Sequence, residues 1–222
     1  MKIVSWNCNG KFREKFKFII QEDADIYIIQ ECENPNFFET IFDFFSYHYL
    51  WFGDNKNKGL AIFAKKNIIL SNNNWECYSL RNFVSIKVNG KYDLIAVWAG
   101  KPYIEEYYIY QKIHINKYNE NTILIGDFNS NAIWDKEHGK RNHTEVVKEL
   151  EKINIVSAYH YFNREEMGKE TKPTFYMYRH LDRPYHIDYC FANPNRLISF
   201  EIIKTNNMLE LSDHLPIKVE IE

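Results

Sequence analysis

Residues 123–129 read Ile123-Leu124-Ile125-Gly126-Asp127-Phe128-Asn129, an apolar run that ends in a carboxylate and an amide. A short, continuous apolar run bounded by turn residues is typical of a strand that is buried on both faces. Asp127 and Asn129 have polar side chains, which are uncommon in a hydrophobic core. Each also has an ordinary interpretation, because Asp127 can cap a turn and the Asn129 amide can bond the local backbone. The stretch therefore predicts a buried strand that ends in either a turn or a functional site.

The same pattern, an apolar run with polar side chains at one end, occurs at four other places. Residues 3–6 end at Asn7, and residues 26–29 end at Gln30 and Glu31. Two further runs have polar residues at their start, namely His186, Asp188, Asp213 and His214. If these ends meet at one edge of two packed sheets, four carboxylates share a pocket with imidazoles and amides.

Short apolar runs rich in Val, Ile, Tyr and Phe recur along the chain and are separated by turn signals. The predicted strands are 2–6, 26–30, 47–52, 59–64, 84–88, 92–98, 122–126, 155–159, 174–178, 186–191, 200–204 and 216–221. Helical periodicity is found at about 11–22, 104–117 and 143–153, and polar loops are predicted at 130–142 and 160–172. Many strands with few helices predict an α+β fold, in which two packed sheets carry helices on their outer faces.

The composition is that of a globular protein, with 222 residues, 45% of them hydrophobic, and we expect a single domain over residues 1–222. A net charge of −2 excludes a protein that coats nucleic acid or acidic membrane by charge alone. No apolar run reaches the ~18 residues of a membrane span, and no signal-peptide stretch is seen. We therefore expect a cytoplasmic monomer without a membrane partner. Buried free thiols are favoured over a disulfide for the four cysteines, Cys8, Cys32, Cys77 and Cys190.

A cluster of carboxylates predicts a bound cation. Carboxylates that share a pocket repel one another, so they must be protonated, paired with a cation or bound to metal. The candidate ligands at the strand ends are oxygen-rich and include no cysteine. This set favours Mg²⁺ first and Mn²⁺ next over a structural zinc ion. A hard cation held by few carboxylates is the usual arrangement for chemistry on phosphate esters.

Six blocks of sequence together resemble the endonuclease/exonuclease/phosphatase superfamily, which includes exonuclease III, apurinic endonucleases and deoxyribonuclease-like enzymes. The blocks are residues 2–10, Gln30-Glu31, 58–63, 126–130, 186–189 and 212–217. They occur in the family's order and extend over nearly the whole chain. The resemblance implies a four-layer α/β/β/α sandwich of two mainly antiparallel sheets, with the site at one end of the paired sheets.

The resemblance also implies roles for metal binding and for catalysis. Glu31 resembles the principal metal ligand of the family, with Asn7 and Asp213 in support. Asp127 resembles the residue that orients or deprotonates the attacking water, and Asn129 the amide that holds this water or a phosphate oxygen.

His214 resembles the imidazole that contacts the scissile phosphate, and Asp188 the carboxylate that pairs with it. Hydrolysis at phosphorus needs a positioned water, a base and positive charge near the oxygens, so the chemistry of these residue types agrees with the implied roles.

The sequence departs from the family before the Gly-Asp-Phe-Asn block. Family members have a Tyr or His at the end of the preceding strand, where this chain has Trp98. Trp98 cannot act as an acid near neutral pH, so Lys101 or Tyr103 is the candidate replacement as a phosphate contact. The candidate contacts to substrate are Lys101, Tyr103, Trp134, Arg179, Arg183 and His186.

We consider three functions. The first is a Mg²⁺-dependent phosphodiesterase that acts on nucleic acid, as an endonuclease or a 3′-exonuclease, with nucleic acid as the partner. The second is a phosphatase or phosphodiesterase for a small or lipid head-group phosphate. The third is a catalytically silent binding module with the same fold. It is disfavoured because the chain retains the residues that match the family's metal-binding and catalytic positions, namely Asn7, Glu31, Asp127, Asn129, Asp188, Asp213 and His214.

Overall fold

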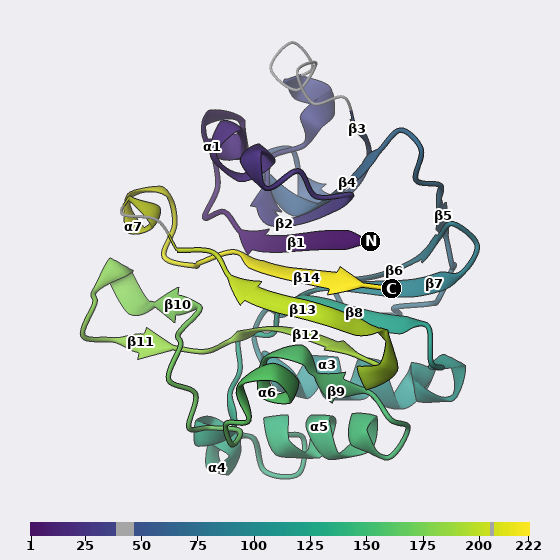
Figure 1. Ribbon diagram of the computed structural model, residues 1–222, viewed down its shortest axis with the longest axis vertical. Helices are drawn as coiled ribbons and strands as arrows, with labels where there is room; N and C mark the ends of the chain where they lie inside the picture. The colour runs from purple at the N-terminus through teal and green to yellow at the C-terminus, as the bar shows by residue number, and fades with distance from the viewer. Residues whose placement is uncertain (39–46, 205–206) are drawn as a thin grey trace.

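The structure, a computed structural model, describes residues 1–38, 47–204 and 207–222. Two six-stranded sheets pack face to face (Figure 1). The first has the order β13 (Leu197–Ile202), β14 (Ile217–Ile221), β1 (Lys2–Asn7), β2 (Ile26–Cys32), β4 (Lys58–Lys65) and β3 (Tyr47–Asn55). The second has the order β5 (Leu70–Asn72), β6 (Phe83–Val88), β7 (Tyr92–Trp98), β8 (Thr122–Asp127), β12 (Asp188–Ala192) and β9 (Val156–Ser157).

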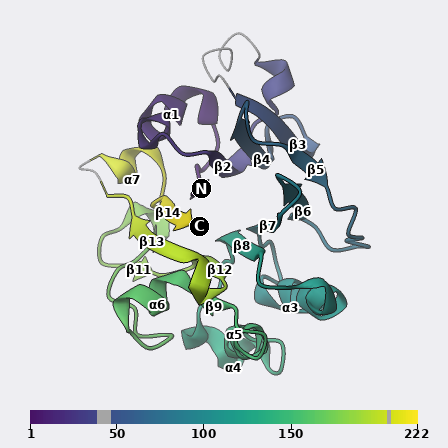
Figure 2. The same ribbon diagram turned by 45° about the vertical axis from the view of Figure 1, so that its right-hand side comes forward.

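Helices cover the outer faces of both sheets (Figures 1 and 2). The α-helices of the described residues are α1 (Phe12–Ile19), α3 (Ile104–His114), α4 (Asp135–His138), α5 (His143–Glu151), α6 (Ala158–Asn163) and α7 (Met208–Leu211). The 3₁₀ segments are η1 (Ile20–Glu22), η2 (Pro35–Phe37), η3 (Ile115–Lys117), η4 (Ala132–Trp134), η5 (Met177–Arg179) and η6 (Pro194–Arg196). Helix α1 packs on the first sheet, and α3 and α5 pack on the second, which confirms the four-layer sandwich.

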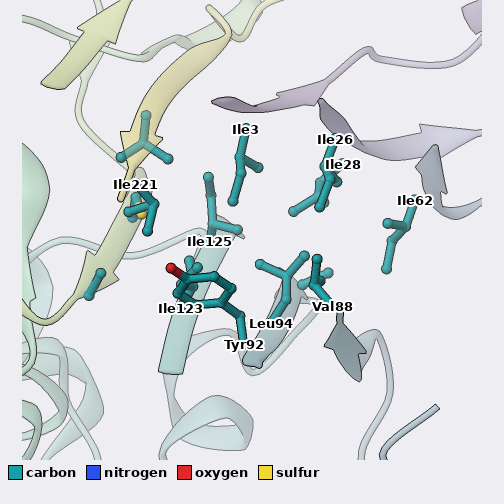
Figure 3. Packing of buried hydrophobic residues seen from close by; sticks show 14 of the residues in the cluster. Ile3, Ile26, Ile28, Ile62, Val88, Tyr92, Leu94, Ile123, Ile125 and Ile221 are labelled. Carbon is teal, nitrogen blue, oxygen red and sulfur yellow. The ribbon is translucent and has the colours of Figure 1, made fainter. Parts of the chain in front are cut away.

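The strands are apolar on both faces because each face meets another layer. Successive side chains of a strand point to opposite faces. In β8, Ile123 and Ile125 pack between the sheets (Figure 3), whereas Leu124 packs towards the helices. Ile3 and Ile28 of the first sheet pack in the same central layer (Figure 3). This double burial explains why the strands read as continuous apolar runs.

Two parallel strand pairs bring the strand ends with polar residues to one edge of each sheet. Strand β1 pairs in parallel with β2, and β7 pairs in parallel with β8, whereas the other pairs in the two large sheets of the described residues are antiparallel. Asn7 is therefore beside Gln30, and Trp98 is beside Asp127. Gly126 lets β7 and β8 approach closely, because its φ is 149° and an added Cβ would lie 1.9 Å from the Val97 carbonyl oxygen.

One predicted strand is shorter than expected and continues into a helix. Residues 155–159 were expected to be extended, but only Val156–Ser157 forms β9, and α6 begins at Ala158. A short apolar run fits either a strand or a helix, so the sequence pattern alone does not separate β9 from α6. The predicted loop at 160–172 therefore begins inside a helix.

A second predicted strand is shorter than expected. Within 174–178, only Phe175–Tyr176 is extended, as β10, and the chain then turns through η5. Strand β10 pairs with β11 (Pro184–Tyr185) in a separate hairpin, which lies beside α7 at one end of the sandwich (left in Figure 1). The other predicted strands and helices are present, with ends that differ by a few residues, and the predicted loop at 130–142 contains η4 and α4.

The four cysteines are free thiols, as predicted. Across residues 1–38, 47–204 and 207–222, no helix combines the length and the apolar composition that a membrane crossing requires.

Candidate active site

Asp127 occupies the centre of the polar cluster at the end of β8 and is fully buried. The side-chain amide of Asn7 donates to Asp127 Oδ2 at 2.9 Å, and that of Asn129 donates to the same oxygen at 3.0 Å. The backbone N–H of Asn129 donates to the other oxygen, Oδ1, at 2.9 Å. Residues from β1 and from the turn after β8 thus fix both oxygens of one carboxylate.

His214 lies between two carboxylates. Its Nδ1 is 3.0 Å from Asp188 Oδ2 and 3.2 Å from Oδ1, and its Nε2 is 3.9 Å from Asp127 Oδ2. The ring of Phe175 packs 4.6 Å from the imidazole, centroid to centroid. The backbone around His214 is fixed as well, because Trp6 Nε1 donates to the His214 carbonyl oxygen at 3.0 Å. The carboxylate of Asp188 therefore orients a ring whose other nitrogen is directed at Asp127.

Burial and charge shift the pKa values of this cluster. The pKa of Asp127 is raised to about 7, mainly because burial disfavours its charged form, while the His214 ring opposes the shift and Asp188 adds to it. Burial alone would lower the pKa of His214, but the carboxylates of Asp188 and Asp127 raise it to about 10. Both shifts favour the protonated forms of Asp127 and His214.

Glu31 is displaced from the regular strand by a β-bulge. The pairing of β2 with β4 shifts between Gln30 and Cys32, so that Glu31 has no partner in the ladder, and its φ is 60°. Bulges commonly redirect a side chain beside an active site. The carboxylate of Glu31 lies 2.9 Å from the ammonium of Lys58, which also lies over the ring of Trp98 at 5.7 Å.

The predicted ligands Asn7 and Asp213 are joined through short links. The Asn9 side-chain amide donates to Asp213 Oδ1 at 2.9 Å, and the Asn9 backbone N–H donates to Asn7 Oδ1 at 3.1 Å. The Ser212 hydroxyl donates to the Asn7 carbonyl oxygen at 2.7 Å. Asn7 also contacts Asp127, so the structure brings Asn7, Asp213 and Asp127 to one edge of the sandwich.

The donor set of this edge suits a hard divalent cation. Within the described part of the chain, one group of three ligand atoms, from Asp127, Asp188 and His214, has all its members within 4.8 Å of one another. This group contains no thiol, and Asp213 is linked to it through Asn9 and Asn7. Carboxylate and amide oxygens are the donors that Mg²⁺ and Mn²⁺ prefer.

Two of the predicted contacts to substrate, Tyr103 and Trp134, lie beside the site residue Asn129, and three others are exposed on loops. Tyr103 and Trp134 line a cavity together with Asn129, and Lys101 is exposed in the same loop as Tyr103. Arg179 and Arg183 are exposed on the segment between β10 and β11, and Arg179 donates to the Glu210 carbonyl oxygen at 3.0 Å.

His186 lies outside this set. It is 3% exposed, its Nδ1 is 2.8 Å from the Lys172 carbonyl oxygen, and its ring packs 4.3 Å from that of Tyr159. The ring is therefore enclosed by protein in this structure, and the contact between His186 and substrate stays a prediction.

Several residues that support the site are not among the predicted site residues. The Thr174 hydroxyl accepts from the backbone N–H groups of Ile187 and Asp188, each at 3.0 Å. Phe175 supports His214, and Asn9 supports Asp213. Asn9 belongs to the first sequence block of the resemblance, which is a signal that could have identified it, whereas Thr174 and Phe175 belong to none of the blocks.

Comparison with known proteins identifies the family. A family model described as the Endonuclease/Exonuclease/phosphatase family matches residues 4–214. The chain belongs to this family. None of the curated proteins matches the sequence.

Solved structures share the fold of this family member at low sequence identity. The 3′-5′ exonuclease NExo from Neisseria meningitidis has a TM-score of 0.73 and 17% identity, and each chain is covered fully, at 100%. An AP endonuclease from Archaeoglobus fulgidus has a TM-score of 0.71 and 20% identity, covering 100% of this chain and 99% of the other. NExo from Neisseria, described as a 3′ phosphatase bound to a product DNA hairpin, has a TM-score of 0.72 and 16% identity, covering 100% and 99%.

Proposed function

We propose that this chain is a divalent-metal-dependent phosphodiesterase that hydrolyses phosphodiester bonds in nucleic acid. The observation that supports it best is the buried carboxylate of Asp127, which accepts amide hydrogen bonds from Asn7 and Asn129 and lies 3.9 Å from Nε2 of His214. Membership of the Endonuclease/Exonuclease/phosphatase family supports hydrolysis of phosphate esters.

Asp127 serves in proton transfer, and His214 stabilises negative charge. A general base works best when its pKa lies near the working pH, and Asp127, with a pKa raised to about 7, meets this condition. The water oxygen bonds to phosphorus as the P–O bond to the leaving oxygen breaks, and the leaving oxygen takes up a proton from solvent. Asp127 accepts the proton of the attacking water through one carboxylate oxygen, while Asn129 holds the water in place. The imidazolium of His214 donates to a phosphate oxygen as negative charge develops there. Asp188 keeps the ring of His214 charged and oriented.

Glu31, Asn7 and Asp213 are the residues that would hold Mg²⁺ or Mn²⁺. When bound, such an ion polarises the phosphate oxygens and stabilises the negative charge of the transition state. The ammonium of Lys58 adds positive charge beside Glu31 at the same edge.

Nucleic acid is the proposed substrate. The exposed cations Lys101, on the loop after β7, and Arg179 and Arg183, between β10 and β11, could contact the phosphates of a polynucleotide. The named neighbours of similar fold include an exonuclease, an AP endonuclease and a protein bound to a DNA hairpin.

A direct assay tests the proposal. Plasmid DNA, a duplex with an abasic site, single-stranded DNA and RNA are each incubated with the protein and Mg²⁺ or Mn²⁺, with and without EDTA, beside an Asp127→Asn control. We expect cleavage of at least one substrate that EDTA and Asp127→Asn both abolish. If no polynucleotide is cleaved, the proposal is wrong. Release of phosphate from a 3′-phosphorylated oligonucleotide or a small phosphate ester would then support the second function.

A further inference from the structure

A turn with a left-handed backbone lies between the end of β1 and the start of α1. Asn9, Gly10 and Lys11 have φ values of 53°, 72° and 52°. A residue with a side chain adopts such a φ at a cost in free energy, and it stays there only where surrounding contacts hold it. Specific contacts must therefore hold this turn.

Asn9 connects the turn to two of the proposed metal ligands. Its backbone N–H donates to Asn7 Oδ1 at 3.1 Å, and its side-chain amide donates to Asp213 Oδ1 at 2.9 Å. Asn7 and Asp213 come from opposite ends of the sequence. The conformation of Asn9 therefore sets how the oxygen atoms of these two side chains are placed relative to each other.

Lys15 of α1 holds the turn in place. Its half-buried ammonium donates to the Cys8 carbonyl oxygen at 2.6 Å and to the Asn9 carbonyl oxygen at 3.3 Å. Hydrogen bonds from a charged donor are stronger than those between neutral groups. One ammonium thus fixes the peptide groups on both sides of the Asn9 side chain.

Helix α1 is itself anchored to the strand end that carries Glu31. The buried carboxylate of Glu33 accepts from the backbone N–H groups of Phe12 and Arg13, at 2.7 Å and 2.9 Å, and from Arg13 Nη1 at 3.1 Å. Glu33 follows the bulge at Glu31 by two residues. The helix therefore links the segment of Glu31 to the turn that contains Asn9.

We propose that Lys15 is a positioning residue of the Mg²⁺ or Mn²⁺ site, which holds Asn9 and, through Asn9, the oxygen atoms of Asn7 and Asp213. The inference rests on the proposed function, because it concerns the ion that this function requires. The positive charge of Lys15 alone opposes the binding of a cation. Removing this charge would therefore tighten metal binding, whereas losing the position of the ligands weakens it.

The test measures Mn²⁺ affinity by titration calorimetry rather than turnover. We expect Lys15→Met to weaken Mn²⁺ binding by about tenfold, as loss of a residue that supports metal ligands does. Lys17 is an exposed lysine on the same helix, so Lys17→Met is the matched control, and its affinity should stay within about twofold of that of the unsubstituted protein. Far-UV circular dichroism shows that each variant is folded.

A double-mutant cycle locates the effect at Asn9. Asn9→Ala removes the side-chain bond to Asp213 and should itself weaken Mn²⁺ binding. In protein that carries Asn9→Ala, the further change Lys15→Met should cost about threefold in affinity or less, because two residues that act through one contact are not additive.

The outcomes separate this inference from the proposed function. Unchanged or tighter Mn²⁺ binding by Lys15→Met, or additive effects in the cycle, overturns the positioning role and leaves the hydrolytic function standing. Absence of Mn²⁺ binding by the unsubstituted protein overturns both. If Lys15→Met does not fold, Lys15→Gln, which keeps a shorter and neutral donor, replaces it in the same comparison with the same expected direction.

Discussion

Asp127 and Asp188 are directly opposite each other on the antiparallel strands β8 and β12. Like charges in this position destabilise a sheet. His214 offsets the repulsion, because its two ring nitrogens are directed at the two carboxylates, at 3.9 Å and 3.0 Å. The pairing of β8 with β12 and the proposed catalysis therefore both depend on the imidazole of His214.

Asp127→Asn should abolish turnover without unfolding the protein. The amide has nearly the shape of the carboxylate, but it cannot accept a proton from water. We expect kcat to fall by about 10³-fold, within the range for loss of a general base. Initial rates with a polynucleotide substrate, together with circular dichroism, measure both properties. Asp54→Asn, at an exposed aspartate, is the control, and full activity of the Asp127 variant would contradict the proposed role.

Glu31→Gln should weaken the binding of divalent ions by about tenfold or more, because an uncharged amide replaces a carboxylate ligand. Titration calorimetry with Mn²⁺ measures the affinity, with the exposed Glu166→Gln as control. Unchanged affinity in Glu31→Gln would remove Glu31 from the metal site.

Lys58→Met should have the opposite effect on Mn²⁺ affinity. The ammonium of Lys58 lies 2.9 Å from the Glu31 carboxylate and competes with a cation for it. Removing this positive charge should tighten Mn²⁺ binding in the same calorimetric titration. Weaker binding would show that Lys58 organises the ligand instead of competing for it.

His143 should make the fold sensitive to acid. It is fully buried, neither of its ring nitrogens has a hydrogen-bond partner among the described residues, and burial lowers its pKa to about 3. In the unfolded chain the ring titrates near 6.5, so the unfolded state binds a proton that the folded state does not as the pH falls. The free energy of unfolding should therefore be about 2 kcal/mol lower at pH 5 than at pH 7 through this residue.

Urea titrations at pH 5 and pH 7 measure this contribution. His143→Phe should remove it from the difference between the two pH values, whereas His180→Asn, at an exposed histidine, should not. An unchanged difference in His143→Phe would mean that the buried ring does not cause the acid sensitivity.

Gly126→Ala should destabilise the fold rather than alter the chemistry directly. The new Cβ would lie 1.9 Å from the Val97 carbonyl oxygen, and the φ of 149° is unfavourable for any residue with a side chain. We expect a loss of about 3 kcal/mol in the free energy of unfolding, measured by urea denaturation. Gly90→Ala is the control for the positive φ, because Gly90 has a φ of 66° but a Cβ there meets no atom within 4 Å, so the difference between the two variants reports the close contact alone. Equal stability of the two variants would contradict the close approach of β7 and β8.

The strand ends with polar residues could be predicted from the sequence. A strand that is buried on both faces is a continuous apolar run, and a polar residue at its end is easy to recognise. Asp127 interrupts an apolar run, and the parallel pairing of β7 with β8 then places it beside Trp98. The β10–β11 hairpin could not be predicted in detail, since strands of two residues show no period. The burial of His186 depends on packing against Tyr159, which lies in a helix that the sequence pattern did not distinguish from a strand.

The bulge at Glu31 makes this edge of the sheet sensitive to a change in chain length. Because Glu31 is the surplus residue between Gln30 and Cys32, its deletion would leave a regular ladder against β4. One lost codon could thus erase the acid while preserving the strand. Under the proposed role of Glu31, this deletion would remove a metal ligand and leave the buried core of the sheet intact.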